Sequence, residues 1–204
     1  MARPRVHDAA LRDRLLDVAS RTISERGEAA VTVRTVAGAA GTSASAVYAL
    51  FGSRDELVAA VSAEGFRRFA AHLASAPRTD DPVADLGALA VAYRAFALDD
   101  PHFYAVMFGR GVRPAADAPD AVEQATFGTL RDAVARVVAG PDGTGQDVAQ
   151  DVVRDVALGL WGLVHGLVSL ELAGLVPGDE PARAARYAAA TRAVGSGLVS
   201  APPG

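Results

Sequence analysis

The segment from residue 32 to residue 51 restricts the possible fold most, because two short helical patterns there are separated only by a glycine turn. Thr32 is placed to cap the first helix and Ser43 the second. Gly41 suits a turn with positive φ. Helices joined this tightly cross steeply, so they need a small residue at the crossing, which Ala37 provides, and apolar residues that hold the second helix. Those apolar residues are Val36, Val47 and Phe51. The pattern is typical of a helix-turn-helix.

Helical patterns fill most of the remaining chain, and the fold class we predict is all-α with about nine helices. Asp8 is placed to cap the first helix, and Gly27 to end it. A turn-rich joint at 76–82 marks a domain boundary. We expect a three-helix helix-turn-helix domain at 1–56, a connecting helix at 53–75, and a C-terminal helical domain at 76–204, which the family resemblance described below identifies as the ligand-binding and dimerisation domain. The expected helices cover 9–26, 33–40, 44–51, 53–75, 83–98, 102–108, 120–139, 147–173 and 182–198.

The charge balance says little about DNA by itself, since the formal net charge is −4. Residues 1–60 contain eight Arg and seven acidic residues, so this part is slightly basic while the rest is acidic. What matters for contact with phosphate is whether arginines cluster on one face, because the local field decides the attraction.

The residues predicted to face DNA lie on and beside the second helix of the motif. Their short side chains offer few bidentate base contacts, so we expect recognition through Thr42, Arg34, methyl contacts and DNA shape. Tyr48 is placed to donate its hydroxyl to a phosphate, and Arg34 and Arg54 could add charged contacts. The full predicted DNA-binding set is Thr32, Arg34, Thr42, Ser43, Ser45, Ala46, Tyr48 and Arg54.

Residues 11–57 resemble the N-terminal domain of the TetR family of transcriptional regulators. The matching features are an apolar first helix followed by Gly27, Thr32, Val36-Ala37, Gly41-Thr42-Ser43, Val47-Tyr48, Phe51 and Ser53-Arg54-Asp55-Glu56-Leu57. Leu50 stands where the family often has a polar residue or His, and Arg54 where Lys is common. The resemblance implies a homodimer formed through the last two helices. It also implies binding to a double-stranded DNA operator and repression of nearby genes until a small effector binds.

The C-terminal half resembles the effector domain of the WHG type found in part of that family, through the segments 93–96, 101–108 and 161–166. Aromatic residues suit a largely apolar effector, although many of them could simply be core, and His165 could be a hydrogen-bonded core histidine. The predicted effector-pocket residues are Tyr93, Phe96, Phe103, Tyr104, Met107, Phe127, Trp161 and His165.

No sequence motif supports an enzymatic function, a metal site or a membrane function. The chain has no Cys, its four histidines (His7, His72, His102 and His165) are far apart, and neither a phosphate loop nor a nucleophile elbow occurs, so we predict no catalytic residue, metal or cofactor. The longest uncharged apolar run, 156–170, is shorter than the ~20 residues that cross a bilayer. We therefore expect a cytoplasmic regulator without a membrane role. The alternatives are a constitutive DNA-binding regulator without an effector, and a helical enzyme or carrier.

Overall fold

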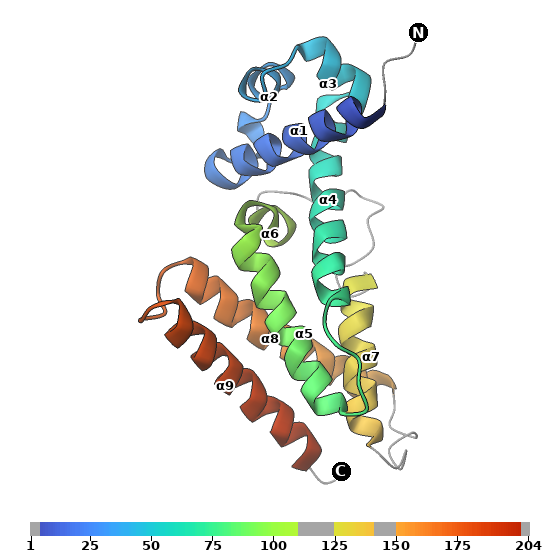
Figure 1. Cartoon of the computed structure of the whole chain (residues 1–204), viewed down its shortest axis with the longest axis vertical. Coiled ribbons are helices and arrows are strands. Elements are labelled where there is room, and N and C mark those ends of the chain that lie inside the picture. Colours follow the sequence, from blue (N-terminus) through green and yellow to red (C-terminus); the bar gives the residue numbers. More distant parts are fainter. Residues whose placement is uncertain (1–4, 110–124, 141–149, 201–204) are drawn as a thin grey trace. The chain divides into compact units, whose positions relative to one another are not determined.

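The computed structural model describes residues 5–109, 125–140 and 150–200, and these contain nine α-helices and no strand, as predicted (Figure 1). The helices are α1 (Arg5–Arg26), α2 (Val33–Ala39), α3 (Ala44–Phe51), α4 (Arg54–Ala74), α5 (Pro82–Asp99), α6 (Pro101–Phe108), α7 (Ala125–Ala139), α8 (Gln150–Leu172) and α9 (Glu180–Ser200). The predicted starts of α7 and α8 lie outside the described residues, as does most of the loop predicted between α6 and α7.

Packing divides the chain into two compact units, and this division does not follow one cut in the sequence. The N-terminal unit comprises residues 1–68 and 100–118, and the C-terminal unit comprises residues 69–99 and 119–204. Helix α4 therefore contributes to both units, and α6 belongs to the N-terminal unit although it follows α5. The two packing units have other bounds than the domains expected from the sequence, 1–56 and 76–204. The expected functional domains stay a prediction.

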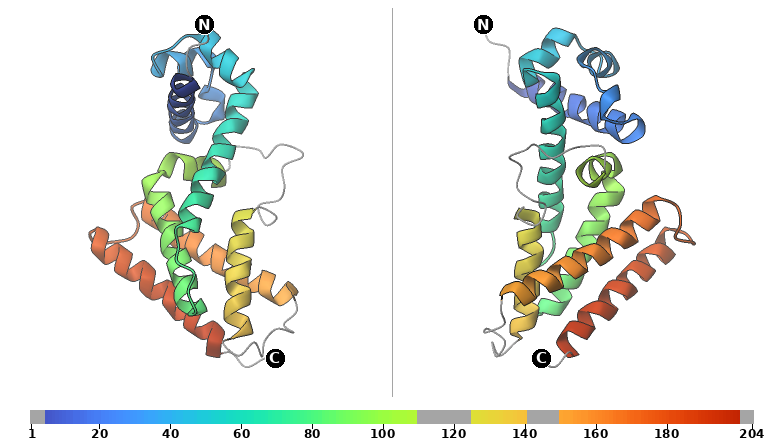
Figure 2. Two further views of the ribbon diagram at one scale, coloured as in Figure 1. Left: turned by 45° about the vertical axis from the view of Figure 1, so that its right-hand side comes forward. Right: turned by 180° about the vertical axis from the view of Figure 1, so that it is seen from behind.

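The core of the N-terminal unit contains buried residues of α1 and α4, together with buried residues of α2, α3 and α6. Leu15, Leu16 and Ala19 of α1 are fully buried, as are Leu57 and Val61 of α4. Helix α1 lies against α6 and reaches the α2–α3 pair, an arrangement visible in both views of Figure 2. The unit therefore holds the helix-turn-helix on a scaffold of three further helices.

The beginning and the end of α1 differ from the prediction. The helix begins at Arg5, so residue 8 lies inside it and does not precede it. Gly27 has a positive φ of 80° as expected, but its ψ of 160° is extended and not left-handed helical. The chain then makes a 3₁₀ turn, η1 (Glu28–Ala30), which the sequence pattern did not indicate.

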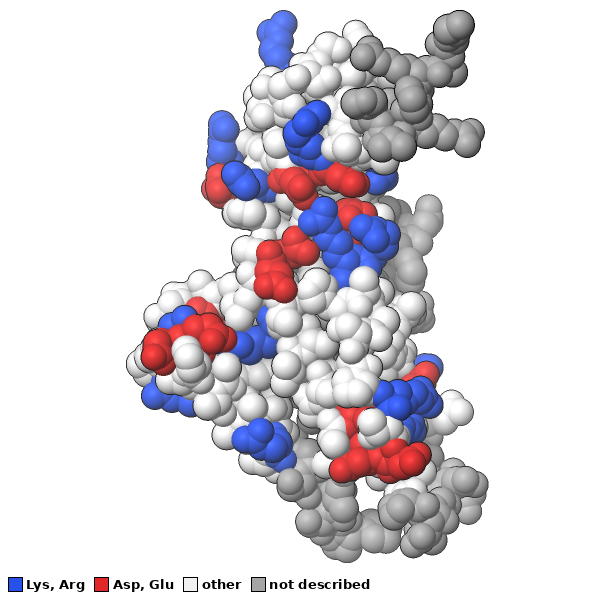
Figure 3. Space-filling view, viewed as in Figure 1, with Lys and Arg blue, Asp and Glu red and all other residues white. Residues whose placement is uncertain are grey.

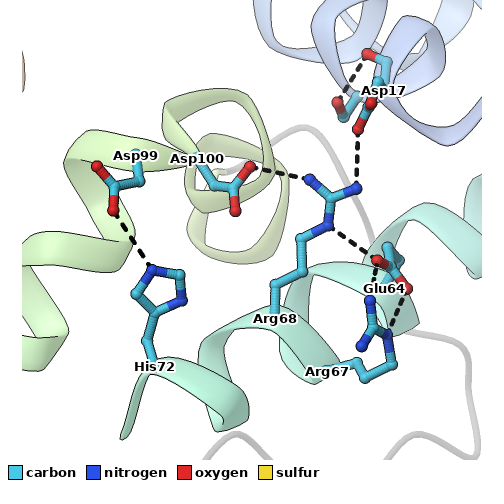
Figure 4. A network of polar contacts seen from close by, with 8 residues as sticks. Asp17, Glu64, Arg67, Arg68, His72, Asp99 and Asp100 are labelled. Atoms are coloured by element: carbon cyan, nitrogen blue, oxygen red, sulfur yellow. Dashed lines mark hydrogen bonds and ion pairs between the residues drawn. The ribbon is translucent and has the colours of Figure 1, made fainter. Parts of the chain in front are cut away.

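Arg68 of α4 joins three helices of the N-terminal unit through its guanidinium group (Figure 4). It contacts Asp17 of α1 at 2.9 Å, Glu64 of α4 at 2.8 Å and Asp100, which precedes α6, at 2.9 Å. The same guanidinium lies 4.2 Å from the centre of the Phe103 ring, a cation–π arrangement. These contacts secure α6 to α1 and α4.

Glu64 is the buried acid of this network. The hydrogen bond from Arg67 lowers the pKa of Glu64, burial opposes this effect, and the hydrogen bond from Arg68 adds to the lowering, so that the pKa falls to about 2. Glu64 therefore remains ionised at neutral pH and forms ion pairs with Arg67 and Arg68.

The C-terminal unit has its own apolar core between α5, α7 and α8. Its buried members are Leu86, Phe127, Val134, Val137, Val153, Ala157 and Leu160, and Trp161 packs against them. Helix α9 packs on α5, where the Tyr187 hydroxyl donates to the Ala90 carbonyl at 2.8 Å.

A second buried ion network joins α5, α8 and α9. Arg94 of α5 donates two hydrogen bonds to the carboxylate of Glu171 in α8, at 2.8 and 2.6 Å. Arg183 of α9 donates to the same carboxylate at 3.2 Å. Hydrogen bonding from Arg94 lowers the pKa of Glu171, an effect that burial opposes. The network therefore links both α5 and α9 to α8 through the carboxylate of Glu171.

Helix α8 has 23 residues and contains an 18-residue window with a mean hydropathy of 1.3, so by length and composition alone it is long and apolar enough to cross a membrane. It is longer than the uncharged run predicted from the sequence because charged residues such as Arg154 and Glu171 lie within it. One such helix is weak evidence of a membrane span, since the core helix of a globular protein passes the same test. Only 22% of that window is buried inside the structure: Val153 and Ala157 are buried, whereas Leu158 is exposed.

Removing Arg94 from the buried ion network with Glu171 and Arg183 should destabilise the protein strongly. We expect Arg94→Met to lower the free energy of unfolding by about 3 kcal/mol, because Glu171 then stays buried with only the more exposed Arg183 beside it. The measurement is urea unfolding at one protein concentration. Because the pKa of Glu171 is lowered by folding, the stability that it contributes is present above its ordinary value of 4.5. The difference between the variants should shrink as the pH falls through the folded pKa.

The control for this prediction is Arg131→Met, which removes an equally long side chain from an exposed ion pair with Asp132. We expect it to change the stability by less than about 1 kcal/mol. Equal effects of the two substitutions at pH 7 would contradict the importance of the buried network.

Candidate DNA interface and effector site

The two helices of the motif cross over a single short turn whose contacts match the prediction. Gly41 has a φ of 67°, and the next amide, that of Thr42, donates to the Ala37 carbonyl at 2.9 Å. Val36 and Val47 are completely buried at the crossing, and Phe51 is buried at the end of α3.

Both predicted caps are present. The Thr32 hydroxyl accepts from the Thr35 amide at 3.1 Å, and the Thr35 hydroxyl accepts from the Thr32 amide at 3.0 Å, which completes a capping box at the start of α2. At the start of α3 the Ser43 hydroxyl accepts from the Ala46 amide at 3.2 Å. The caps fix where each helix begins, and hence which residues of α3 face outward.

The outward face of α3 is narrow and carries small side chains. Ser43, Ser45 and Tyr48 are exposed, with 54% of Tyr48 accessible, while Thr42 and Ala46 are half-buried beside them. Arg34 is exposed on the first turn of the neighbouring α2. The structure thus places the predicted residues of α2 and α3, apart from the capping Thr32 hydroxyl, where a ligand could reach them, and their contact with DNA stays a prediction.

Arg54, the remaining predicted DNA contact, has its guanidinium group engaged inside the protein. It donates to the carbonyls of Val31 and Glu28 and to the carboxylates of Glu28 and Asp55. The sequence could not show this, because all of these acceptors except Asp55 lie more than twenty residues earlier, in and directly after a 3₁₀ turn that has no apolar periodicity.

Charged side chains of both signs alternate on the face of the molecule in Figure 3. Arginines there are interspersed with acidic residues and form no continuous basic surface on that face. On this face, attraction of phosphate would depend on individual side chains, in agreement with the weak charge asymmetry of the sequence.

The predicted effector-pocket residues do not all belong to the same unit. Phe103, Tyr104 and Met107 lie on α6 in the N-terminal unit, where Met107 occupies the space in front of Gly65. A Cβ atom at Gly65 would lie 2.8 Å from the Met107 side chain, so a larger residue there would require the Met107 side chain to move. A glycine inside a helical pattern is the sequence signal that could have indicated this contact.

The other five predicted pocket residues, Tyr93, Phe96, Phe127, Trp161 and His165, lie in the C-terminal unit. The Tyr93 hydroxyl and the His165 Nδ1 atom are 3.0 Å apart. Trp161 lies between Phe127 and His165, with ring centres 5.8 and 6.5 Å away. Phe96 packs on Phe69, with ring centres 5.1 Å apart. Burial lowers the pKa of His165, so the imidazole is neutral at neutral pH. Whether this aromatic cluster binds an effector stays a prediction.

Two family models match the chain. Residues 15–61 match the model described as bacterial regulatory proteins of the tetR family, and residues 86–194 match the model described as the tetracyclin repressor-like C-terminal domain. The first match covers the helix-turn-helix, and the second covers more than half of the chain. A comparison with curated protein sequences gave no match.

Several solved structures are similar over almost the whole chain. The regulatory protein SCO4313 is 28% identical, with a TM-score of 0.68, over 98% of this chain and 100% of that one. A protein from Rhodococcus sp. RHA1 is 29% identical, with a TM-score of 0.69, over 93% of this chain and 96% of that one. A TetR-like transcriptional regulator from the same organism, 21% identical with a TM-score of 0.66 over 98% of this chain and 100% of that one, shares the fold. The helix-turn-helix geometry, the helical C-terminal unit and both family matches together establish that the chain belongs to the TetR family of transcriptional regulators.

Proposed function

We propose that this regulator is a cytoplasmic repressor that binds a pseudo-palindromic operator as a homodimer and releases it when a small, largely apolar molecule binds. The observation that carries the proposal is the exposed face of α3, where capped and buried flanking residues present Ser43, Ser45 and Tyr48 to solvent. Two such helices about 34–36 Å apart would enter successive major grooves on one side of the duplex.

The chemistry of α3 favours a particular kind of DNA recognition. Its exposed residues carry no amide or guanidinium group, the groups that make bidentate hydrogen bonds to adenine or guanine. The methyl groups of Ala46 and Thr42 suit contact with thymine methyl groups, and Tyr48 and Arg34 suit contact with phosphates. We expect operator specificity to come from thymine methyl groups and groove shape.

The proposed homodimer is supported by residues of α8 and α9 that the subunit leaves uncovered. Leu158 is 46% exposed on α8, and Val194 is 40% exposed on α9. Gly159 and Gly162 are exposed beside Leu158, and a Cβ atom added at either would meet nothing within 4 Å. These glycines therefore serve no close packing within the subunit. We propose that they allow α8 of a second copy to approach closely.

The effector site is proposed for the aromatic cluster of the C-terminal unit, with Trp161 and His165 as the central contacts. A 100-fold loss of operator affinity on effector binding requires a coupling free energy of about 2.7 kcal/mol. The alternative is a constitutive regulator whose aromatic residues are only core. A thermal-shift screen with apolar and aromatic molecules separates the two, because a ligand of the folded state raises the unfolding temperature. We propose no enzymatic role, because the family consists of transcriptional regulators.

Operator binding should depend on the exposed residues of the motif. We expect Tyr48→Ala and Arg34→Ala each to weaken operator binding by roughly 1–3 kcal/mol. Arg34→Ala should also reduce the slope of log affinity against log salt concentration by the amount expected for about one phosphate contact per subunit. The measurement is fluorescence anisotropy with an operator obtained by in vitro selection, over a series of salt concentrations. The matched control is Arg131→Ala, which replaces an exposed arginine of α7 and should leave operator binding unchanged. Unchanged affinity in both motif variants would place the DNA contact elsewhere.

Dimerisation should be lost when a charge is placed on the exposed face of α8. We expect Leu158→Glu to convert the protein to a monomer, because two carboxylates would face each other in an apolar interface. The measurement is light scattering coupled to size-exclusion chromatography. Val91→Glu on α5 is a matched control, since Val91 is also an exposed aliphatic residue, with 53% of its surface accessible. A monomeric wild type, or a dimeric Leu158→Glu variant, would overturn the proposed interface.

A further inference from the structure

Arg54 is the first residue of α4 and stands where the family resemblance suggests a cation that contacts a phosphate. We propose instead that Arg54 is a positioning residue, which holds α2 and α3 in the arrangement that fits DNA and does not itself contact the duplex. The inference rests on the proposed DNA-binding function and goes beyond it, because it assigns one residue a role that exposure and charge alone do not indicate.

The hydrogen bonds of Arg54 leave no donor for a phosphate. A guanidinium group has five N–H donors. The Nε atom donates to the Val31 carbonyl at 2.9 Å, and Nη2 donates to the Glu28 carbonyl at 2.7 Å and to Glu28 Oε1 at 3.3 Å. Nη1 donates to Glu28 Oε1 at 3.3 Å and to Asp55 Oδ1 at 2.9 Å. All five donors are therefore used within the protein.

The surroundings of Arg54 also oppose binding of an anion. Two carboxylates, those of Glu28 and Asp55, lie within 3.3 Å of the guanidinium and together carry more negative charge than it carries positive. A phosphate brought to this point would approach both acids. A cation at the N-terminus of a helix is also unfavourable for the helix dipole, so Arg54 does not stabilise α4 by its charge. What it does provide is a set of bonds to the segment before α2.

These bonds connect the beginning of α2 to the end of α3. Glu28 and Val31, whose carbonyls accept from Arg54, stand at either end of the 3₁₀ turn η1, and Thr32, the cap of α2, follows immediately. On the other side, Gly52 and Ser53 lead from the end of α3 directly to Arg54. One side chain thus fixes the start of α2 relative to the end of α3, and with it the separation between Arg34 and Tyr48.

A lysine at this position would keep the charge but could not make the bonds. Its ammonium group has three donors at one point and cannot span two carbonyls and two carboxylates as the planar guanidinium does. The substitution Arg54→Lys therefore separates the two possible roles, because a phosphate contact tolerates lysine and the positioning role does not.

The test compares the wild type with Arg54→Lys and Arg54→Met, with Arg34→Lys and Arg34→Met as the matched pair at an exposed arginine. Anisotropy titrations use the selected operator and an unrelated duplex at several salt concentrations, at a temperature where circular dichroism shows each variant folded. We expect Arg54→Lys and Arg54→Met to weaken operator binding alike, by about tenfold if only a tenth of the molecules keep the competent arrangement. Their salt dependence and their binding to the unrelated duplex should match the wild type. Arg34→Lys should bind normally, and only Arg34→Met should lower the salt dependence, by about 0.9 for each phosphate contact.

Two results would overturn the inference. Normal binding by Arg54→Lys together with a lower salt dependence in Arg54→Met would show a phosphate contact. Normal operator binding by both variants with only a lower unfolding temperature would show a purely structural role.

Amide hydrogen exchange without DNA distinguishes a failure of this inference from a failure of the proposed function. In Arg54→Lys we expect faster exchange at Thr35 and Val36, whose amides bond to Thr32 at the start of α2. If the wild type did not discriminate operator from unrelated DNA, the proposed function would fail together with the inference. Faster exchange in the variant would then still show that Arg54 holds this segment. Unchanged exchange would contradict the inference by itself.

Discussion

The close crossing of α2 and α3 is the constraint on which the DNA-facing surface depends. Ala37 is buried at the crossing, and the turn that follows needs the positive φ of Gly41. The buried side chains of Val36 and Val47 hold α3 against α2. A larger residue at position 37 or a β-carbon at position 41 would change the direction of α3 and would move Tyr48 away from its present place. The polar caps add to this, since they fix the first residue of each helix.

Much of this arrangement could be predicted from the sequence because it is local. A cap, a turn glycine and an apolar stripe act within a few residues, so the ends of α2 and α3 agree with expectation to within a residue. The 3₁₀ turn after Gly27 was missed because three residues carry no periodicity. The role of Arg54 was missed because two of its acceptors are main-chain carbonyls far away in the sequence, and any residue provides a carbonyl. A side chain that binds main-chain atoms far away in the sequence leaves no compositional trace.

Which of the aromatic residues predicted to line an effector pocket lie together was harder to predict, because this depends on which helices share a unit. The aromatic residues of α5, α6, α7 and α8 look equivalent in the sequence, yet α6 packs with α1 and α4 in the N-terminal unit. Phe103 lies under the Arg68 guanidinium there, and Tyr104 packs on Phe108. Those residues have packing roles that explain their aromatic character without a ligand. The cluster around Trp161 and His165 has a polar pair inside an apolar surrounding, the combination that ligand sites commonly use.

The measurement that tests the central claim most directly is in vitro selection of DNA by the wild-type protein, followed by determination of how many subunits bind each selected site. The account predicts a pseudo-palindrome whose half-sites lie about 10–10.5 base pairs apart, or a multiple of this spacing, bound by an even number of subunits. It also predicts that replacing the half-site thymines with deoxyuridine weakens binding, because α3 offers methyl groups and no bidentate donors. Selection that enriches no sequence, or enriches single half-sites bound by one subunit, would contradict it.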